Sequence, residues 1–224
     1  MNWTAIWVTC KLASLTSIAL LVIGLPIAYW LAYSKWRWKF LIESIVALPL
    51  VLPPTVLGFY ILVTIGPHSP IGQFYSDLVG YPLPFSFQGL LIASILYSLP
   101  FAVQPFATAF EQIDRKLIEA SWTLGLSKLQ TFFKLIIPLS TAGLITGVVL
   151  SFAHTLGEFG VVLMVGGNIE GVTRTVSIEI YDNVQALDYA GAAKTSAFLL
   201  VVSYAVLLLV YSVNRRVWSV WPKK

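Results

Sequence analysis

A run of seventy residues, 41–110, contains only two charged side chains, Glu43 and Asp77. About one residue in four is charged in an ordinary soluble domain, so this run has the composition of a polypeptide that folds inside lipid. The whole chain agrees, with 58% hydrophobic and 11% charged residues. The sequence therefore indicates a membrane protein, and its net charge of +4 does not indicate a partner among the nucleic acids.

Five apolar stretches are each long enough to cross a bilayer, since about 20 helical residues span the roughly 30 Å of hydrocarbon. Strands of an outer-membrane barrel would alternate apolar and polar residues, whereas residues 197–211 are apolar on every side. We therefore predict an all-α, polytopic membrane protein in which residues 1–224 form a single transmembrane domain. The five predicted spans are at about 5–33, 42–65, 86–110, 136–165 and 190–213.

The basic residues fall on one side of these spans. Eleven of the fourteen follow the first, third or fifth span, and cytoplasmic loops are the ones enriched in positive charge. The opposite loops, 66–85 and 166–189, contain five carboxylates and only Arg174 as a basic residue. We predict an amino terminus outside and a carboxyl terminus inside the cytoplasmic (inner) membrane, with tryptophan anchors at both interfaces. The basic residues are Lys35, Arg37, Lys39, Arg115, Lys116, Lys128, Lys134, Arg215, Arg216, Lys223 and Lys224, and the anchors are Trp3, Trp7, Trp36, Trp38, Trp218 and Trp221.

Motifs for catalysis and for cofactor binding are absent from the sequence. No phosphate-binding loop of the Gly-x-x-x-x-Gly-Lys-Ser/Thr type occurs, Cys10 is the single cysteine, and the two histidines, His68 and His154, are far apart. We therefore predict a protein that is not itself an enzyme and has no metal or cofactor. Six prolines interrupt the first three spans. Each removes a backbone donor, so these spans are expected to be kinked in a packed bundle or to line a wet path.

The segment 111–135, between the third and fourth predicted spans, is too polar to cross a membrane and too apolar for an open loop. Leu117, Ala120 and Leu124 share one helical face, and Gly125 follows at a point where glycine would weaken a continuous helix. We predict two short cytoplasmic helices joined by a turn at Gly125. Such a unit suits a groove on another protein, and an amphipathic connector on the lipid surface is the alternative.

This segment resembles the cytoplasmic loop of the permease subunits of ATP-binding cassette importers. That loop has the pattern Glu-Ala-Ala, three residues, Gly, nine residues, Ile-x-Leu-Pro, and here Glu119-Ala120-Ser121, Gly125 and Leu135-Ile136-Ile137-Pro138 occupy its positions. The resemblance implies a homodimer of the permease, two ATP-binding cassette ATPase subunits, an extracytoplasmic binding protein and surrounding membrane lipid. It also implies that the ATPase is coupled through Glu119, Ala120, Ser121, Leu124, Gly125 and Leu126.

Three further segments, 48–55, 151–160 and 166–175, are similar to the molybdate importer permeases, and the resemblance covers nearly the whole chain. It implies import of molybdate or tungstate with a molybdate-binding protein as partner. Sulfate importer permeases are the alternative, but they usually have an additional amino-terminal span. A stand-alone secondary transporter, the competing class, would need coupling-ion carboxylates or an internal repeat, and neither is evident.

A doubly charged oxyanion needs a polar route, because moving an ion into hydrocarbon costs on the order of tens of kcal/mol. The spans and outer loops contain few fixed positive charges, so the route is expected to bind the anion weakly. Hydroxyl groups are the candidate lining, although in helical bundles they also bond neighbouring helices. The candidates are Thr55, Ser94, Ser98, Ser151 and Thr155.

Two further pairs lie in the fourth predicted span. His154 occupies a position that is usually arginine in the molybdate group. It lies four residues before Glu158, so the two side chains can touch. Because a bare carboxylate would repel a dianion, we expect Glu158 to be structural, paired with His154 or with backbone donors. Gly143 and Gly147 form a Gly-x-x-x-Gly pair and are expected at a helix contact.

Overall fold

The computed structural model describes residues 2–213. These residues form helices and no β-strand, so the all-α prediction is confirmed for this part of the chain. Three helices are long and apolar enough to span a membrane by themselves: α1 (Trp3–Tyr33), α5 (Phe87–Glu111) and α12 (Tyr189–Val213). Two bent helix pairs raise the number of candidate spans to as many as five. The predicted anchors Trp218 and Trp221 and the basic residues Arg215, Arg216, Lys223 and Lys224 lie outside the described residues.

The other helices are short or belong to the bent pairs. Between α1 and α5 the chain forms α2 (Lys39–Ala47), the 3-10 turn η1 (Leu48–Leu50), α3 (Pro54–Ile65) and α4 (Pro70–Val79). Between α5 and α12 it forms α6 (Arg115–Thr123), α7 (Lys128–Thr131), the π-helical turn η2 (Phe132–Ile136), α8 (Ile137–Leu139), α9 (Thr141–Gly157), α10 (Gly160–Gly166) and α11 (Val176–Gln185).

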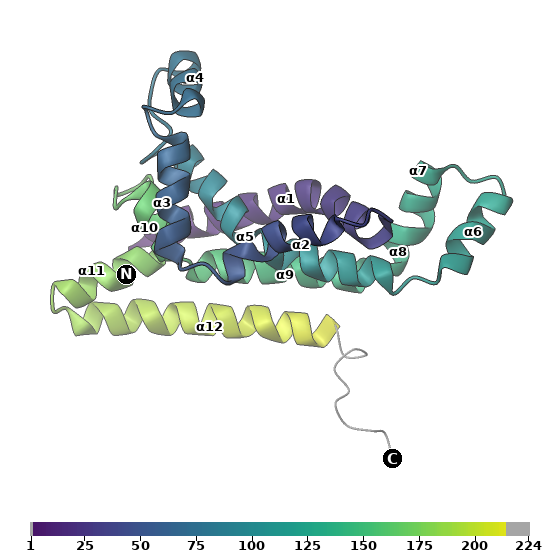
Figure 1. The fold of residues 1–224 in the computed structure, drawn as a ribbon. Coiled ribbons are helices and arrows are strands. Elements are labelled where there is room, and N and C mark those ends of the chain that lie inside the picture. Colours follow the sequence, from purple (N-terminus) through teal and green to yellow (C-terminus); the bar gives the residue numbers. More distant parts are fainter. Residues whose placement is uncertain (1, 214–224) are drawn as a thin grey trace.

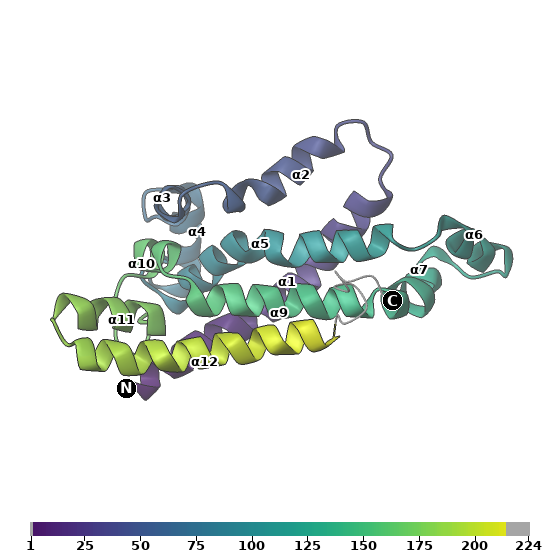
Figure 2. The ribbon, with the colours of Figure 1, turned by 90° about the horizontal axis from the view of Figure 1, so that it is seen from below.

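Helices α1, α5 and α9 pack side by side, and α12 runs along α9 (Figures 1 and 2). Large apolar side chains such as Phe106 and Phe110 fill the core of this bundle and are fully buried. Glycines let α9 approach α5 closely. A Cβ atom at Gly147 would lie 2.5 Å from the Phe106 ring, and one at Gly143 would overlap the side chain of Ala109. The helix contact predicted for the two glycines is confirmed.

The second predicted span is not one straight helix. Its two halves, Lys39–Leu50 and Pro54–Ile65, meet at an angle of 111°, because two consecutive prolines lack the N–H groups that would continue the helical hydrogen bonds. Helix α3 therefore leaves the direction of the bundle (Figure 1) and packs against α10. Its outward side presents large exposed rings, among them Phe59 and Tyr60.

The fourth predicted span is also divided. Helix α9 ends at Gly157, the next two residues are not helical, and α10 begins at Gly160. Glycine favours such an interruption because, after proline, it has the lowest helix propensity. At the other end of α9, the residues Lys128–Leu139 meet the helix at 74°. The straight part of this span is therefore α9 alone.

The short helices gather at opposite ends of the bundle (Figure 1). The start of α1 lies with α4, α10 and α11 at one end, and α6 and α7 project from the other. At the first end the backbone N–H of Asn2 donates to Glu179 (3.0 Å), and Arg174 lies within 4 Å of Glu170 and Asp182. These contacts tie the amino terminus to the segment around α11.

Candidate functional site

The segment 111–135 contains the predicted pair of short helices. We call residues 115–131 the helix–turn–helix unit. Asp114 caps its first helix by accepting a hydrogen bond from the backbone N–H of Lys116 (2.9 Å), as short acceptors do at helix starts. Gly125 has a φ of +85° and no atom within 4 Å of the position of a Cβ. The turn therefore needs glycine for its backbone angle and not for space.

Side-chain hydrogen bonds stabilise the unit, both within its second helix and between its two helices. Ser127 and Gln130 form a reciprocal capping box at the start of α7. The buried hydroxyls of Ser121 and Thr131 lie 2.9 Å apart and join α6 to α7, and Ser121 also donates to the carbonyl of Ile118 (2.6 Å). Sequence reasoning missed this bond, although the serine at the second alanine position of the loop pattern was a signal for it.

The outward side of the helix–turn–helix unit is an apolar surface. Leu124 is 83% exposed, Ala120 and Glu119 are exposed, and Leu126 is half-buried. Exposed apolar side chains gathered in one place mark an interaction site. Of the residues predicted for coupling, Glu119, Ala120, Leu124 and Gly125 are therefore exposed, Leu126 is partly covered, and Ser121 is buried and bonds the two helices from inside.

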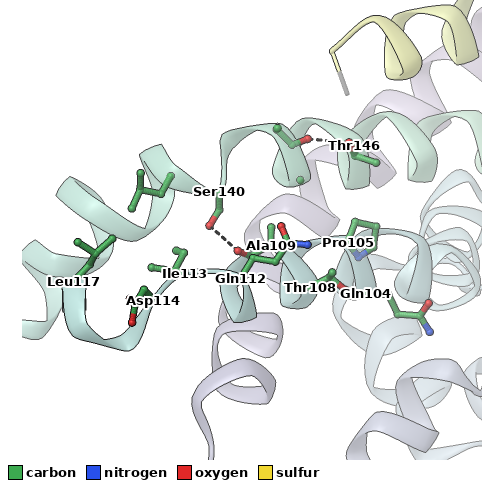
Figure 3. A pocket seen from close by; sticks show the side chains of 13 residues that line it. Gln104, Pro105, Thr108, Ala109, Gln112, Ile113, Asp114, Leu117, Ser140 and Thr146 are labelled. Atoms are coloured by element: carbon green, nitrogen blue, oxygen red, sulfur yellow. Dashed lines mark hydrogen bonds between the residues drawn. The ribbon is translucent and has the colours of Figure 1, made fainter. Parts of the chain in front are cut away.

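The unit continues into α9 through the π-helical turn η2. Pro138 lies in the following turn, and Ser140 ends α8 at the bend of 74°. The Ser140 hydroxyl donates to the carbonyl of Ala109 on α5 over 3.5 Å (Figure 3). Single π-turns inside helices are frequent at functional sites. The segment that follows the unit thus connects it to α5, through Ser140, and to α9.

The hydroxyls predicted to line a route lie elsewhere. Ser94, Ser98, Ser151 and Thr155 are at most 1% exposed. The Ser98 and Thr155 oxygens are 3.0 Å apart across α5 and α9, and Ser151 donates to the carbonyl of Val148. In the single chain these four side chains lie inside the bundle, where they bond or pack helices; their assignment to a path stays a prediction.

The expected pairing of His154 with Glu158 is also not present in the described residues. His154 Nδ1 lies 3.0 Å from the Ser98 hydroxyl, and its ring stacks on Phe101. Glu158 follows the end of α9, is 4% exposed, and neither of its carboxylate oxygens has a hydrogen-bond partner among the described residues. The Ser94 hydroxyl lies near the carboxylate, but the two groups do not meet the geometry of a hydrogen bond. His154 turns toward α5 because Ser98 and Phe101 offer it a hydrogen bond and a ring.

Polar side chains are exposed along one face of α5. Gln104 and Thr108 line both a cavity of about 700 Å³ between α5 and α9, the α5/α9 cavity, and one of about 470 Å³ between α2 and α5, the α2/α5 cavity. Figure 3 shows Gln104, Thr108 and Gln112 on the α5 side of the first cavity, and Ser140 and Thr146 across from them. An amide facing hydrocarbon would have no hydrogen-bond partner. This face of α5 is therefore not a lipid-facing one.

The same face of α5 continues toward α3. Tyr97 and Phe101 precede Gln104 and Thr108 at spacings of four, three and four residues, which puts all four on one stripe. Tyr97 borders a cavity of about 600 Å³, the α3/α9 cavity, together with Thr55 and His154. Thr55 is the one predicted lining hydroxyl found there. We call the α5 stripe together with these three cavities the groove along α5. Among the described residues its lining contains no Lys or Arg, but it contains the acidic residues Glu43, Glu111, Asp114 and Glu158.

The chain matches the family described as "Binding-protein-dependent transport system inner membrane component" over residues 24–219. It is 53% identical over 211 residues to the molybdenum transport system permease protein ModB of Azotobacter vinelandii, covering 94% of this chain and 93% of that protein. It is 32% identical over 208 residues to a probable sulfate transport system permease protein, cysT, of Chlorella vulgaris, covering 92% of this chain and 77% of that protein.

The fold is similar to that of a chain in a bacterial alginate ABC transporter, solved in complex with an alginate pentasaccharide-bound periplasmic protein. The TM-score is 0.74 with 18% sequence identity, and the match covers 96% of this chain and 78% of the other. At this identity the likeness establishes the fold alone. The helices of this chain are thus arranged overall as in a chain of known structure.

Proposed function

Because the chain belongs to the family of binding-protein-dependent transport system inner membrane components, we propose that it forms the membrane path of an ATP-driven molybdate importer. The relative with 53% identity is named for molybdenum transport, and tungstate, with nearly the same size and charge, is expected to share the route. ATP hydrolysis belongs to a separate ATPase subunit, since the chain has no phosphate-binding loop. The chain is thus a transport subunit and not an enzyme.

In this proposal the chain is one transmembrane domain with five spans in the cytoplasmic (inner) membrane. Helices α1, α5 and α12 are three of them, and each bent helix pair supplies one more. The amino terminus lies outside and the helix–turn–helix unit inside, because Lys35, Arg115 and Lys128 belong to loops on the side of the unit. The carboxylates around α11 then lie on the outer side of the membrane.

The helix–turn–helix unit is proposed to dock into a groove on the ATPase, with one ATPase subunit for each of two permease copies. Its exposed Leu124 and Ala120 supply an apolar face, and the Glu119 carboxylate can accept hydrogen bonds from donor groups on the ATPase. Movement of the unit would reach α5 and α9 through η2 and the bond from Ser140 to Ala109. This uncovered, capped unit is the observation that carries the proposal.

A second permease copy is proposed to cover the groove along α5. The two grooves would then enclose one path whose donors are neutral, such as the Gln104 amide and the Thr108 hydroxyl. Neutral donors bind a dianion weakly enough to release it, as conduction requires. Tight capture would belong to an extracytoplasmic molybdate-binding protein, and lipid would surround the outer faces of α1 and α12.

Reconstitution tests this function. Vesicles containing the permease, its ATPase and its binding protein should accumulate molybdate only when ATP is present on the ATPase side. Tungstate should compete with molybdate at similar concentrations. Uptake by the permease without an ATPase would contradict the importer and favour a secondary transporter. Equal competition by sulfate would favour a sulfate-type importer, the alternative for this chain.

A further inference from the structure

A pair of stacked rings lies near two cavities: His154 borders the α3/α9 cavity, and Phe101 lies on α5 between residues that border the α3/α9 cavity and the α5/α9 cavity. The rings of Phe101 and His154 have centroids 3.9 Å apart and planes inclined by 23°. Along α5, Phe101 lies about one helical turn from Tyr97, which borders the α3/α9 cavity. It lies about one turn on the other side from Gln104, which lines the α5/α9 cavity. Along α5, Phe101 therefore lies between the residues that border the two cavities.

The His154 ring is fixed by its surroundings. Its Nδ1 is 3.0 Å from the Ser98 hydroxyl, which in turn lies 3.0 Å from the Thr155 hydroxyl, and both hydroxyls are buried. Tyr97 packs beside it with ring centroids 4.8 Å apart. Hydrogen-bonded networks of this kind hold a side chain in one position. Three rings thus form one aromatic cluster across α5 and α9.

We propose that the stack of Phe101 on His154 is the barrier that closes the anion path. This inference rests on the proposed function, because the groove becomes a path only when a second copy covers it. Both rings are partly exposed in one chain, and a two-fold axis along the path would bring an identical stack from the second copy to the same level. Apolar constrictions stop ions by excluding water, without a plug that fills the path.

The order of side chains along the groove supports a barrier and not a binding site. On one side of the stack, Thr55 and the Tyr97 hydroxyl can solvate an anion in a cavity that the nearly buried Glu158 also lines, and on the other side Gln104 and Thr108 can do so. At the stack itself the path offers two ring faces; His154 Nδ1 is engaged by Ser98, which leaves one ring nitrogen, Nε2, as the polar atom there. A single ring nitrogen cannot replace the hydration shell of a dianion, so passage between the rings is costly. Passage then requires the two helices to separate the rings.

Leakage of the complete complex tests the barrier. Vesicles loaded with molybdate, with two permease copies and their ATPase subunits in the membrane, should release it slowly when ATP and binding protein are absent. Phe101→Ala should raise this release about tenfold or more, since a tenfold change corresponds to about 1.4 kcal/mol of barrier height. Phe101→Leu, which keeps apolar bulk, should raise it less. Unchanged release from Phe101→Ala would overturn the proposal.

A matched control and a readout for His154 accompany this test. Phe74→Ala removes a ring that is 72% exposed on α4, outside the groove, and should leave release unchanged. His154→Phe keeps a ring opposite Phe101 and should stay closed, whereas His154→Ala should leak. Each variant is first shown to co-purify with the ATPase, so that leakage is measured on assembled complexes only. Equal leakage from Phe74→Ala and Phe101→Ala would also overturn the barrier.

A second measurement does not depend on molybdate. In a Cys10→Ser background, Thr55→Cys and Thr108→Cys place thiols in the two cavities on either side of the stack. In the assembled complex without ATP, a membrane-impermeant thiol reagent should reach each of them from one face only. Adding Phe101→Ala should open both positions to both faces. Labelling from both faces with the stack intact would contradict the barrier.

The two measurements separate this inference from the proposed function. If the native chain takes up no molybdate with ATP, its ATPase and its binding protein, the proposed function fails whatever the thiols show. If uptake is normal but the stack neither limits leakage nor divides the two thiols, only the barrier fails.

Discussion

The helix–turn–helix unit and the groove along α5 both expose side chains that a partner could cover. They differ in how far each is held in shape by contacts within this chain. The unit has its own helix cap at Asp114, a capping box, and the hydroxyl pair of Ser121 and Thr131. The groove is open on one side, and Gln104 and Thr108 line two of its cavities. The unit is thus shaped by local sequence before any partner binds. In the proposed function, the groove becomes a path only when a second copy closes it.

The largest effect is expected at Gly125, where the shape of the unit depends on one backbone angle. Gly125→Val forces a branched side chain to a φ of +85°, which costs on the order of 1–2 kcal/mol and favours other turn conformations. We expect membrane insertion to persist, ATPase co-purification to weaken and molybdate uptake to be lost. Glu119→Lys should weaken the same association through reversed charge.

Gly80 provides a matched control for this variant. It has a φ of +88° and, like Gly125, no atom within 4 Å of the position of a Cβ, but it follows α4 at the other end of the bundle. Gly80→Val should introduce similar local strain and leave ATPase association intact. If both valine variants co-purify with the ATPase and transport normally, the unit is not the coupling element.

The second largest effect is expected in the groove. Gln104→Leu removes an amide from the proposed path and should lower ATP-driven uptake about tenfold, because a hydrogen bond to a charged group contributes about 1.5–3 kcal/mol. Gln104→Glu has nearly the same shape but repels an anion, so its uptake should be lower still. ATPase co-purification should be unchanged in both. Gln73→Leu, an exposed glutamine on α4 outside these cavities, is the control; a loss there equal to that of Gln104→Leu would argue against the groove.

What the sequence predicts well is what local interactions determine. The turn at Gly125 and the two helices beside it were predictable because caps and glycine act within a few residues. The contact of Gly143 and Gly147 with α5 followed from a spacing pattern in the same way. The bend of 111° before α3 was not predicted as such, because prolines indicate a break but do not set its angle.

The presence of hydroxyls does not by itself identify the residues of a path. In an apolar span, hydropathy does not tell which side faces a neighbour, and Ser98 and Ser151 proved to be buried between helices. A better signal was available in Gln104, since an amide in the middle of a span cannot face lipid without cost. The spacing from Tyr97 to Thr108 would have given the rest of the stripe.

A smaller effect is expected inside the helix–turn–helix unit. Ser121→Ala removes the hydroxyl that bonds Thr131 and restores the residue usual in the loop pattern, so both helices should still form. Losing one hydrogen bond should lower the stability of the unit by about 1 kcal/mol, so the affinity for the ATPase should fall only a few-fold. Thr131→Val should have a similar effect, and the double variant should be no weaker than either single one. Additive losses would show that the two hydroxyls do not act as a pair.

The smallest effect is expected at Ser151, and it tests which hydroxyls belong to the path. Ser151 is fully buried, donates to the carbonyl of Val148 and lies 3.4 Å from Ser17. Ser151→Ala leaves little empty volume and removes a bond within the bundle, so thermal stability should fall by about 0.5–1.5 kcal/mol. The rate of uptake and its dependence on molybdate concentration should stay as in the native chain, because this hydroxyl faces α1 and not the groove. If Ser151→Ala instead reduces uptake as strongly as Gln104→Leu does, the anion passes through the bundle interior, and the groove along α5 is a surface for the second copy alone.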